Sequence, residues 1–148
     1  MPKLTIFVGS STASRRQAQL LIKDLTAPTI IFLPWWDTFT TGRTLLEELD
    51  TIRNNIQAAI MVFSPDFPGT VRGNSVALVN QNVMFEFGYL TGALGRNKVA
   101  MIRYGDFYLP SDLQGYIHIN GGSYFKAGNA VPASKKTKQE FGRWFEQI

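Results

Sequence analysis

Short apolar runs alternate with amphipathic segments along almost the whole chain. Five runs have the length and composition of buried strands, the fifth being the weakest: residues 4–8, 30–33, 58–63, 99–103 and 116–119. After the first run the period changes, and Ala18, Leu21 and Leu25 recur at helical spacing. Strands that alternate with helices require right-handed crossovers, which produce a parallel sheet with helices on both faces. The sequence therefore predicts an α/β fold, a three-layer sandwich with about five parallel strands.

Capping residues mark two later helices. Asn82 is predicted to cap a helix that runs through Leu94 and stops at Gly95, and Ser134 is predicted to cap a terminal helix. The apolar face of the terminal helix comprises Phe141, Trp144, Phe145 and Ile148. Another helix follows the second strand, and its polar face includes Glu48. Its apolar face comprises Leu45, Leu49, Ile52 and Ile56.

Residues 64–81, between the third strand and the helix expected after Asn82, form a long connection that is rich in Pro, Gly and Asn. Loops of this length in a compact domain are typically functional lids or mobile segments. We therefore expect an irregular loop here.

Length and composition exclude several classes of protein. The 148 residues are enough for one domain, without internal repeat or linker. Cysteine is absent and His118 is the single histidine, which excludes disulfides, thiol nucleophiles and the usual zinc sites, so no metal is expected. His118 itself alternates with two isoleucines and is expected on the outer face of an edge strand.

Charge and hydropathy bear on location and partners. The net charge is +4, but most of it comes from residues 121–148, which carry five basic and two acidic residues. The rest of the chain has no basic stripe interleaved with aromatic residues, so we expect no binding to DNA. No apolar run reaches the ~20 residues that span a bilayer, and the start lacks the features of a signal peptide. We therefore expect a cytoplasmic chain that does not bind membranes.

Ligands of a parallel α/β sheet bind at the carboxyl ends of the strands. In this chain, that rule selects the segments 9–14, 34–41 and 104–114, together with the start of the helix at Asn82. The first of them contains Gly9, Ser10 and Ser11, whose amides and hydroxyls can hold an anion or simply cap the following helix. The second contains Trp35, Trp36, Asp37 and Phe39, which can form a wall for ring stacking or cover the core.

Glu86 is the most informative residue, because it lies in an apolar helical segment between Phe85 and Phe87. Carboxylates are rarely buried unless they are paired or used, and burial raises their pKa. Glu86 can therefore be a catalytic group, a buried carboxylate paired with a residue such as Arg72, or a side chain that points to water. Asp112 lies in a Pro- and Gly-containing turn, where Asp is more often a turn former than a catalyst.

Four segments, in order, resemble a known family: IFVGSS, LPWWDTF, NVMFEFGYLTGALG and LPSDLQG. The chain is similar over residues 4–119 to bacterial TIR-like domains, effectors of anti-phage signalling of the CBASS and STING-associated type. Such domains are found fused to cyclic-nucleotide sensors. One departure is the stretch 79–81, Val-Asn-Gln, where relatives often carry a basic residue before the Asn-Val pair.

The resemblance implies a flavodoxin-like fold that hydrolyses NAD⁺ at the nicotinamide–ribose bond, with NAD⁺ as substrate and no cofactor. It implies that Glu86 is the catalytic glutamate and Asp112 the second acidic residue. The implied substrate-binding residues are Gly9, Ser10, Ser11, Trp36, Asp37, Phe39 and Asn82.

The resemblance also implies regulation. We expect a single domain, residues 1–148, that works with a cyclic-nucleotide-sensing domain or protein and becomes active by self-association, with the 64–81 loop as the switch. Two other functions stay open: a nucleoside deoxyribosyltransferase-like enzyme and a non-catalytic TIR interaction module.

Overall fold

The structure is a computed structural model that describes residues 2–113, 116, 118–124 and 129–148. Its strands are β1 (Leu4–Gly9), β2 (Ile30–Pro34), β3 (Ala58–Phe63), β4 (Phe67–Val71), β5 (Asn74–Leu78), β6 (Val99–Tyr104) and β7 (His118–Gly122). Its α-helices are α1 (Arg15–Leu25), α2 (Trp35–Thr38), α3 (Leu45–Ile52), α4 (Gln81–Leu94) and α5 (Lys135–Phe145). Two 3₁₀ turns, η1 (Arg96–Lys98) and η2 (Ser111–Leu113), complete the order.

Five parallel strands form the central sheet, in the order β2-β1-β3-β6-β7. This is the flavodoxin-like order of doubly wound sheets, in which the strand order reverses beside the first strand. The predicted three-layer α/β fold is therefore confirmed. The fifth strand begins at His118 and ends later than predicted, and residue 117 of the predicted strand lies outside the described residues.

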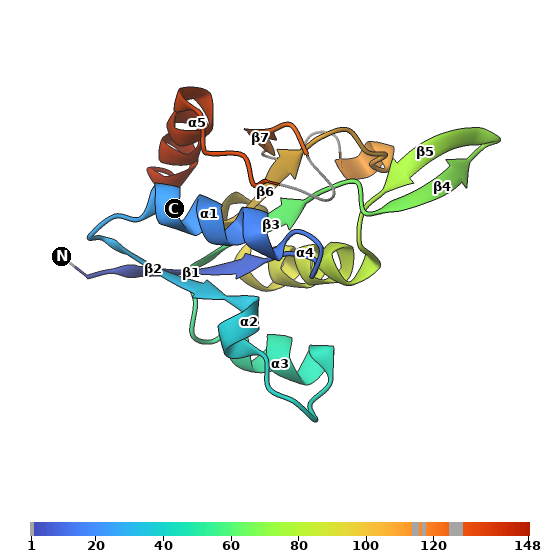
Figure 1. The fold of residues 1–148 in the computed structure, drawn as a ribbon. Coiled ribbons are helices and arrows are strands. Elements are labelled where there is room, and N and C mark those ends of the chain that lie inside the picture. Colours follow the sequence, from blue (N-terminus) through green and yellow to red (C-terminus); the bar gives the residue numbers. More distant parts are fainter. Residues whose placement is uncertain (1, 114–115, 117, 125–128) are drawn as a thin grey trace.

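A separate apolar core covers each face of the sheet. One core joins α1 and α5 to one face, and the other joins α3 and α4 to the opposite face (Figure 1). Strand β3 contributes to both, since its residues alternate: Ala58, Ile60 and Val62 enter the first core and Ala59, Met61 and Phe63 the second. Strand β3 is buried on both faces, which explains its uninterrupted apolar sequence.

The helix caps match the sequence in one case and differ in another. Ser134 caps α5, and its Oγ accepts a hydrogen bond of 3.1 Å from the Thr137 amide. Asn82 does not cap α4, so that prediction was wrong. Asn80 is the cap instead, because its Oδ1 lies 3.1 Å from the Val83 amide and its backbone is extended.

The prediction of an irregular loop over residues 64–81 was also wrong. Strands β4 and β5 form an antiparallel hairpin that projects from the body of the domain (Figure 1). Arg72 and Gly73 form its turn, both with positive φ, at 50° and 82°. Two consecutive residues of this conformation suit the twist of a tight two-residue hairpin. Gly69 allows the close approach of the Leu78 side chain, since a Cβ there would lie 2.4 Å from Leu78 Cδ1.

The packing of α4 can be tested by Leu90→Ala. Leu90 is fully buried in the core between α4 and the sheet, so its truncation leaves a cavity. We expect the free energy of unfolding to fall by about 2–5 kcal/mol, measured by chemical denaturation. The half-exposed Leu46 provides the control, because Leu46→Ala is expected to change stability by no more than about 0.5 kcal/mol. Equal losses in the two variants would contradict the described packing.

Candidate functional site

A cavity of about 170 Å³ opens where β1 and β2 end, and α4 closes its other side. Its lining residues are Ser10, Ser11, Thr12, Trp35, Phe39, Leu45, Asn80, Asn82, Val83 and Glu86. The cavity lies at the carboxyl edge of the parallel sheet, where the strand order reverses between β1 and β3. The structure therefore brings together residues from three of the segments that the sequence selected.

Glu86 is the one acidic residue in this lining. Its side chain lies on the sheet-facing side of α4, among the apolar residues Val83, Phe87 and Leu90. Although it is a carboxyl group, it is only 5% exposed. Its Oε2 atom has no hydrogen-bond partner among the described residues. Burial raises the pKa of this carboxyl from 4.5 to about 8. Glu86 is thus a buried carboxyl that the fold leaves uncompensated.

The sequence also allowed Glu86 to pair with a residue such as Arg72 or to point to water, and the structure shows neither. Arg72 is exposed in the hairpin turn, and no ion pair joins it to Glu86 within the described chain. Nor does Glu86 point to bulk water, since it is buried. Gly9 explains how the carboxylate fits, because a Cβ at this position would lie 3.0 Å from Glu86 Oε2 and 2.4 Å from Met61 Cε.

The aromatic wall of the cavity consists of Trp35 and Phe39. The Trp35 indole donates a hydrogen bond of 2.8 Å to Ser10 Oγ, which fixes the ring over the end of β1. Phe39 packs on Phe7, with ring centroids 5.8 Å apart. The sequence does not decide whether Trp35 forms part of a stacking wall or covers the core. In the structure Trp35 lines the cavity.

Trp36 and Asp37 do not line the cavity, although the resemblance implied both as substrate-binding residues. Trp36 packs against the core on the α1 side of the sheet, and the Arg15 guanidinium lies 5.3 Å from its ring centre. Asp37 is exposed. Residues 35 and 36 diverge because they begin the short helix α2, in which successive side chains are about 100° apart.

The hydroxyl groups of the segment after β1 take part in local hydrogen bonds. Ser11 Oγ accepts a hydrogen bond of 3.2 Å from the Ser14 amide, and Ser10 Oγ donates one of 3.0 Å to the Ser11 carbonyl. Both hydroxyls still line the cavity. These hydrogen bonds shape the turn that leads into α1, whose N-cap residue Ser14 makes no side-chain capping hydrogen bond.

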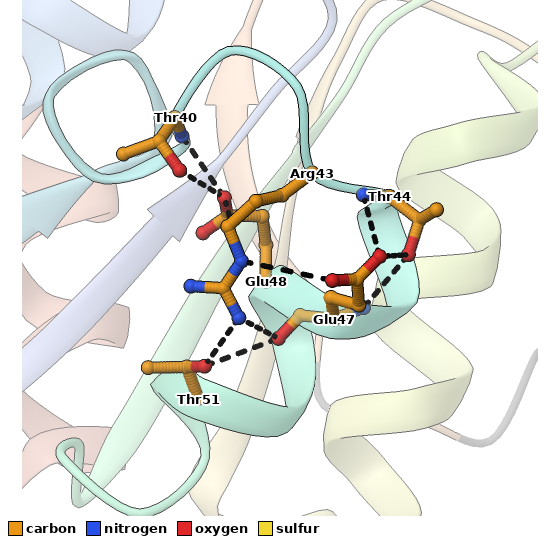
Figure 2. Close-up of polar contacts among 6 residues, drawn as sticks. All are labelled: Thr40, Arg43, Thr44, Glu47, Glu48 and Thr51. Carbon is orange, nitrogen blue, oxygen red and sulfur yellow. Dashed lines mark hydrogen bonds and ion pairs between the residues drawn. The ribbon is translucent and has the colours of Figure 1, made fainter.

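The loop between α2 and α3, which follows Phe39, is held by the carboxylate of Glu48. Helical spacing predicts this residue on the polar face of α3, but the structure buries it. Glu48 is 4% exposed, and its Oε1 accepts hydrogen bonds from the Thr40 amide at 3.0 Å and the Thr40 hydroxyl at 2.6 Å (Figure 2). These hydrogen bonds hold the pKa of Glu48 below its usual value. Arg43 Nε lies 3.8 Å from the same oxygen, and Thr44 and Glu47 form a capping box at the start of α3.

The candidate Asp112 and the single histidine of the chain lie outside this cavity. Asp112 is exposed in η2 and does not belong to the cavity lining. Its implied role as the second acidic residue stays a prediction. His118 is on the edge strand β7, with Nε2 3.3 Å from the Leu113 carbonyl.

The described residues form neither a metal-binding cluster nor a membrane-spanning helix. Among the residues that the structure describes, no three Cys, His, Asp or Glu side chains gather as a metal site would need. None of the described helices combines the length and apolar character that crossing a bilayer requires.

The raised pKa of Glu86 makes stability depend on pH. Between about 4.5 and 8 the folded state holds a proton on Glu86 that the unfolded state has lost, so the free energy of unfolding falls as pH rises. Relative to Glu86→Gln, wild-type stability is expected to fall by up to about 1.4 kcal/mol per pH unit across this window. Urea denaturation of both proteins at several pH values measures the difference.

The exposed Glu146 offers a matched control, since Glu146→Gln is expected to keep the wild-type pH dependence. A difference between wild type and Glu86→Gln that does not change with pH would contradict an uncompensated buried carboxyl.

Comparison with known proteins places this geometry in a family. The chain is 34% identical over 115 residues to CD-NTase-associated protein 12 of Sphingobacterium faecium, covering 76% of this chain and 35% of the relative. It is 35% identical over 91 residues to protein tirC of Dictyostelium discoideum, covering 53% of this chain and 45% of the relative. It is 28% identical over 116 residues to the Pycsar effector protein XpPycTIR of Xanthomonas perforans, covering 76% of this chain and 38% of the relative.

The chain spans less than half the length of each of these three relatives. Residues 5–122 match the family described as CAP12/Pycsar effector protein, TIR domain, and this match includes the whole cavity lining. The chain therefore belongs to the TIR domains of the CAP12/Pycsar effector family.

Proposed function

We propose that this domain hydrolyses NAD⁺ at the bond between nicotinamide and ribose, as the effector of an anti-phage system. The observation that carries the proposal is the unpartnered Oε2 atom of the buried Glu86 beside an aromatic wall. A buried carboxylate without a partner gains most from a cationic ligand, and the nicotinamide ring of NAD⁺ is a cation. The defence role is supported by the matched family, CAP12/Pycsar effector protein, and by the relative named as a Pycsar effector protein.

The reaction needs little from the protein beyond charge and position. Cleavage of the C1′–N bond gives its electron pair to the pyridinium nitrogen, so nicotinamide leaves as a neutral molecule without general-acid help. The ribose then has oxocarbenium character, which a nearby carboxylate stabilises. Water forms the new bond to C1′ and releases a proton, so the products are nicotinamide, ADP-ribose and H⁺.

Each part of the cavity has a role in this proposal. Glu86 as a carboxylate stabilises the positive charge that moves from the ring to the ribose. Trp35 and Phe39 offer flat apolar faces to the nicotinamide ring and exclude water. Approach of the cationic ring favours the charged form of Glu86, which opposes the effect of burial on its pKa.

The decisive variant is Glu86→Gln, which keeps the size of the side chain and removes its charge. We expect nicotinamide release from NAD⁺ to fall by on the order of 10²-fold or more, because transition-state stabilisation is lost. The assay follows nicotinamide by chromatography, and circular dichroism checks that the variant is folded. The control Glu146→Gln is expected to keep full activity.

Other results would redirect the assignment. Near-wild-type turnover by folded Glu86→Gln would exclude Glu86 as the catalytic group. Cleavage of free nucleosides without cleavage of NAD⁺ would favour a deoxyribosyltransferase-like enzyme. An Asp112→Asn variant tests the second acidic residue and is expected to lower the turnover of NAD⁺.

We further propose that activity is controlled by self-association and that a cyclic-nucleotide-sensing domain or protein drives it. An unregulated NAD⁺ hydrolase would deplete the cofactor of its own cell. The β4–β5 hairpin supports this proposal, since neither of its strands pairs with the central sheet in the described chain and Phe67 on it is 50% exposed. A second copy that contacts the hairpin would lie close to the start of α4, the helix that carries Glu86.

Specific activity is therefore expected to rise with protein concentration. Fusion to an oligomerising tag raises the effective concentration of a weak interface and should increase nicotinamide release per domain at a fixed, low concentration. A monomeric tag on the same linker is the control. Full activity that does not change with concentration or tag would contradict control by assembly.

A further inference from the structure

A second and larger groove lies between the β4–β5 hairpin and the start of α4. Its volume is about 420 Å³, and its lining residues are Phe67, Pro68, Leu78, Val79, Asn80, Gln81 and Asn82. None of them is charged. The catalytic proposal assigns no part of the substrate to this groove, although Asn80 and Asn82 also line the Glu86 cavity.

The groove and the Glu86 cavity are neighbours. Asn80 and Asn82 line both of them, so the first turn of α4 is their common wall. The cavity of about 170 Å³ is smaller than the ~300 Å³ at which typical ligand pockets begin, whereas the groove is above that size. A dinucleotide that places one end at Glu86 therefore has to continue elsewhere, and the adjoining groove offers the room.

The chemistry of the groove fits a neutral planar ring with polar edges. Phe67 is 50% exposed and presents an aromatic face, and Leu78 adds apolar surface. Asn80 uses its Oδ1 to cap α4, which leaves its amide nitrogen to donate. Gln81 and Asn82 are exposed amides that can both donate and accept, the side-chain type that pairs with the N6 and N7 edge of adenine.

We propose that this groove binds the adenosine half of NAD⁺ while the nicotinamide riboside half occupies the Glu86 cavity. The proposal rests on the proposed function for the identity of the ligand. In this arrangement the hairpin is part of the substrate site, Phe67 stacks on the base, and the amides of the first turn of α4 read its edge. The substrate then bridges two elements, since it contacts the hairpin on one side and α4 on the other.

The test compares NAD⁺ with nicotinamide mononucleotide, which has the same reacting bond and lacks the adenosine. Phe67→Ala and Gln81→Ala are expected to raise KM for NAD⁺ at least about fivefold more than they raise KM for the mononucleotide. A factor of about five corresponds to the lower end of the free energy that base stacking contributes. The tag-clustered protein is used for all assays. Phe85→Ala is the matched control, because Phe85 is also 50% exposed and lies on α4 outside the groove.

Direct binding of AMP provides a second readout that does not depend on catalysis. We expect AMP to bind wild type and Glu86→Gln alike, measured by calorimetry, and to bind Phe67→Ala and Gln81→Ala at least about fivefold more weakly. If the clustered wild type cleaves neither substrate but AMP binding follows this pattern, the proposed hydrolase function fails and the groove remains a nucleotide site.

Three results would overturn the proposal. One is that AMP does not bind, or that it binds the groove variants with the same affinity as wild type. Another is that a groove variant changes KM for NAD⁺ and KM for the mononucleotide by the same factor. The third is a groove variant that weakens self-association in sedimentation and leaves the ratio of the two KM values unchanged, which would make the groove an interface between copies.

Discussion

The close approach of the Glu86 carboxylate to the end of β1 is the constraint on which the site depends. A Cβ at position 9 would lie 2.4 Å from Met61 Cε and 3.0 Å from Glu86 Oε2, so any larger residue there requires the Met61 side chain to shift. The carboxylate is uncompensated there, which costs stability whenever it is ionised. The apolar residues on the same side of α4, Val83 and Leu90, hold the helix against the sheet and so keep the carboxylate in place.

A second carboxylate, that of Glu48, has the opposite environment to the carboxylate of Glu86. Glu48 is as buried as Glu86, but it accepts two hydrogen bonds from Thr40 and lies near Arg43, and its pKa is lowered (Figure 2). It fixes the loop that follows Phe39, and thereby one edge of the cavity. Glu86 receives no such support within the described chain. The two pKa values therefore shift in opposite directions, because desolvation dominates at Glu86 and the hydrogen bonds from Thr40 dominate at Glu48.

The layered fold could be predicted because its signals are local and redundant. Strand β3 is apolar throughout since both faces are covered, and α4 and α5 carry their apolar residues at helical spacing. The hairpin could not be predicted from the same rules. Pro68, Gly69 and Gly73 are typical of loops, but here Gly69 makes room for Leu78 and Gly73 forms the turn.

The site could be predicted to the level of segments but not of individual side chains. The apolar neighbours of Glu86 made its burial one of the open alternatives, and the structure excludes the side chain that points to water. The choice between Trp35 and Trp36 depended on the short helix α2, whose four residues show no periodicity that sequence reasoning can use. Likewise, Asn80 and Asn82 both resemble caps, and only the extended backbone at Asn80 identifies the true one.

The connection between the hairpin and α4 gives the proposed control by assembly a physical route. Strand β5 ends at Leu78, and two residues later Asn80 caps α4 and lines both the groove and the cavity. The hairpin itself is fastened to the body by a few polar contacts, among them the bond of 2.8 Å from the Tyr108 amide to the Ala77 carbonyl and that from Ser64 Oγ to Asp66 Oδ1. A neighbour that shifts the hairpin must therefore move the groove wall relative to α4. Because the core on the α4 side holds Glu86 in place, such a shift is expected to change the shape of the groove more than the position of the carboxylate.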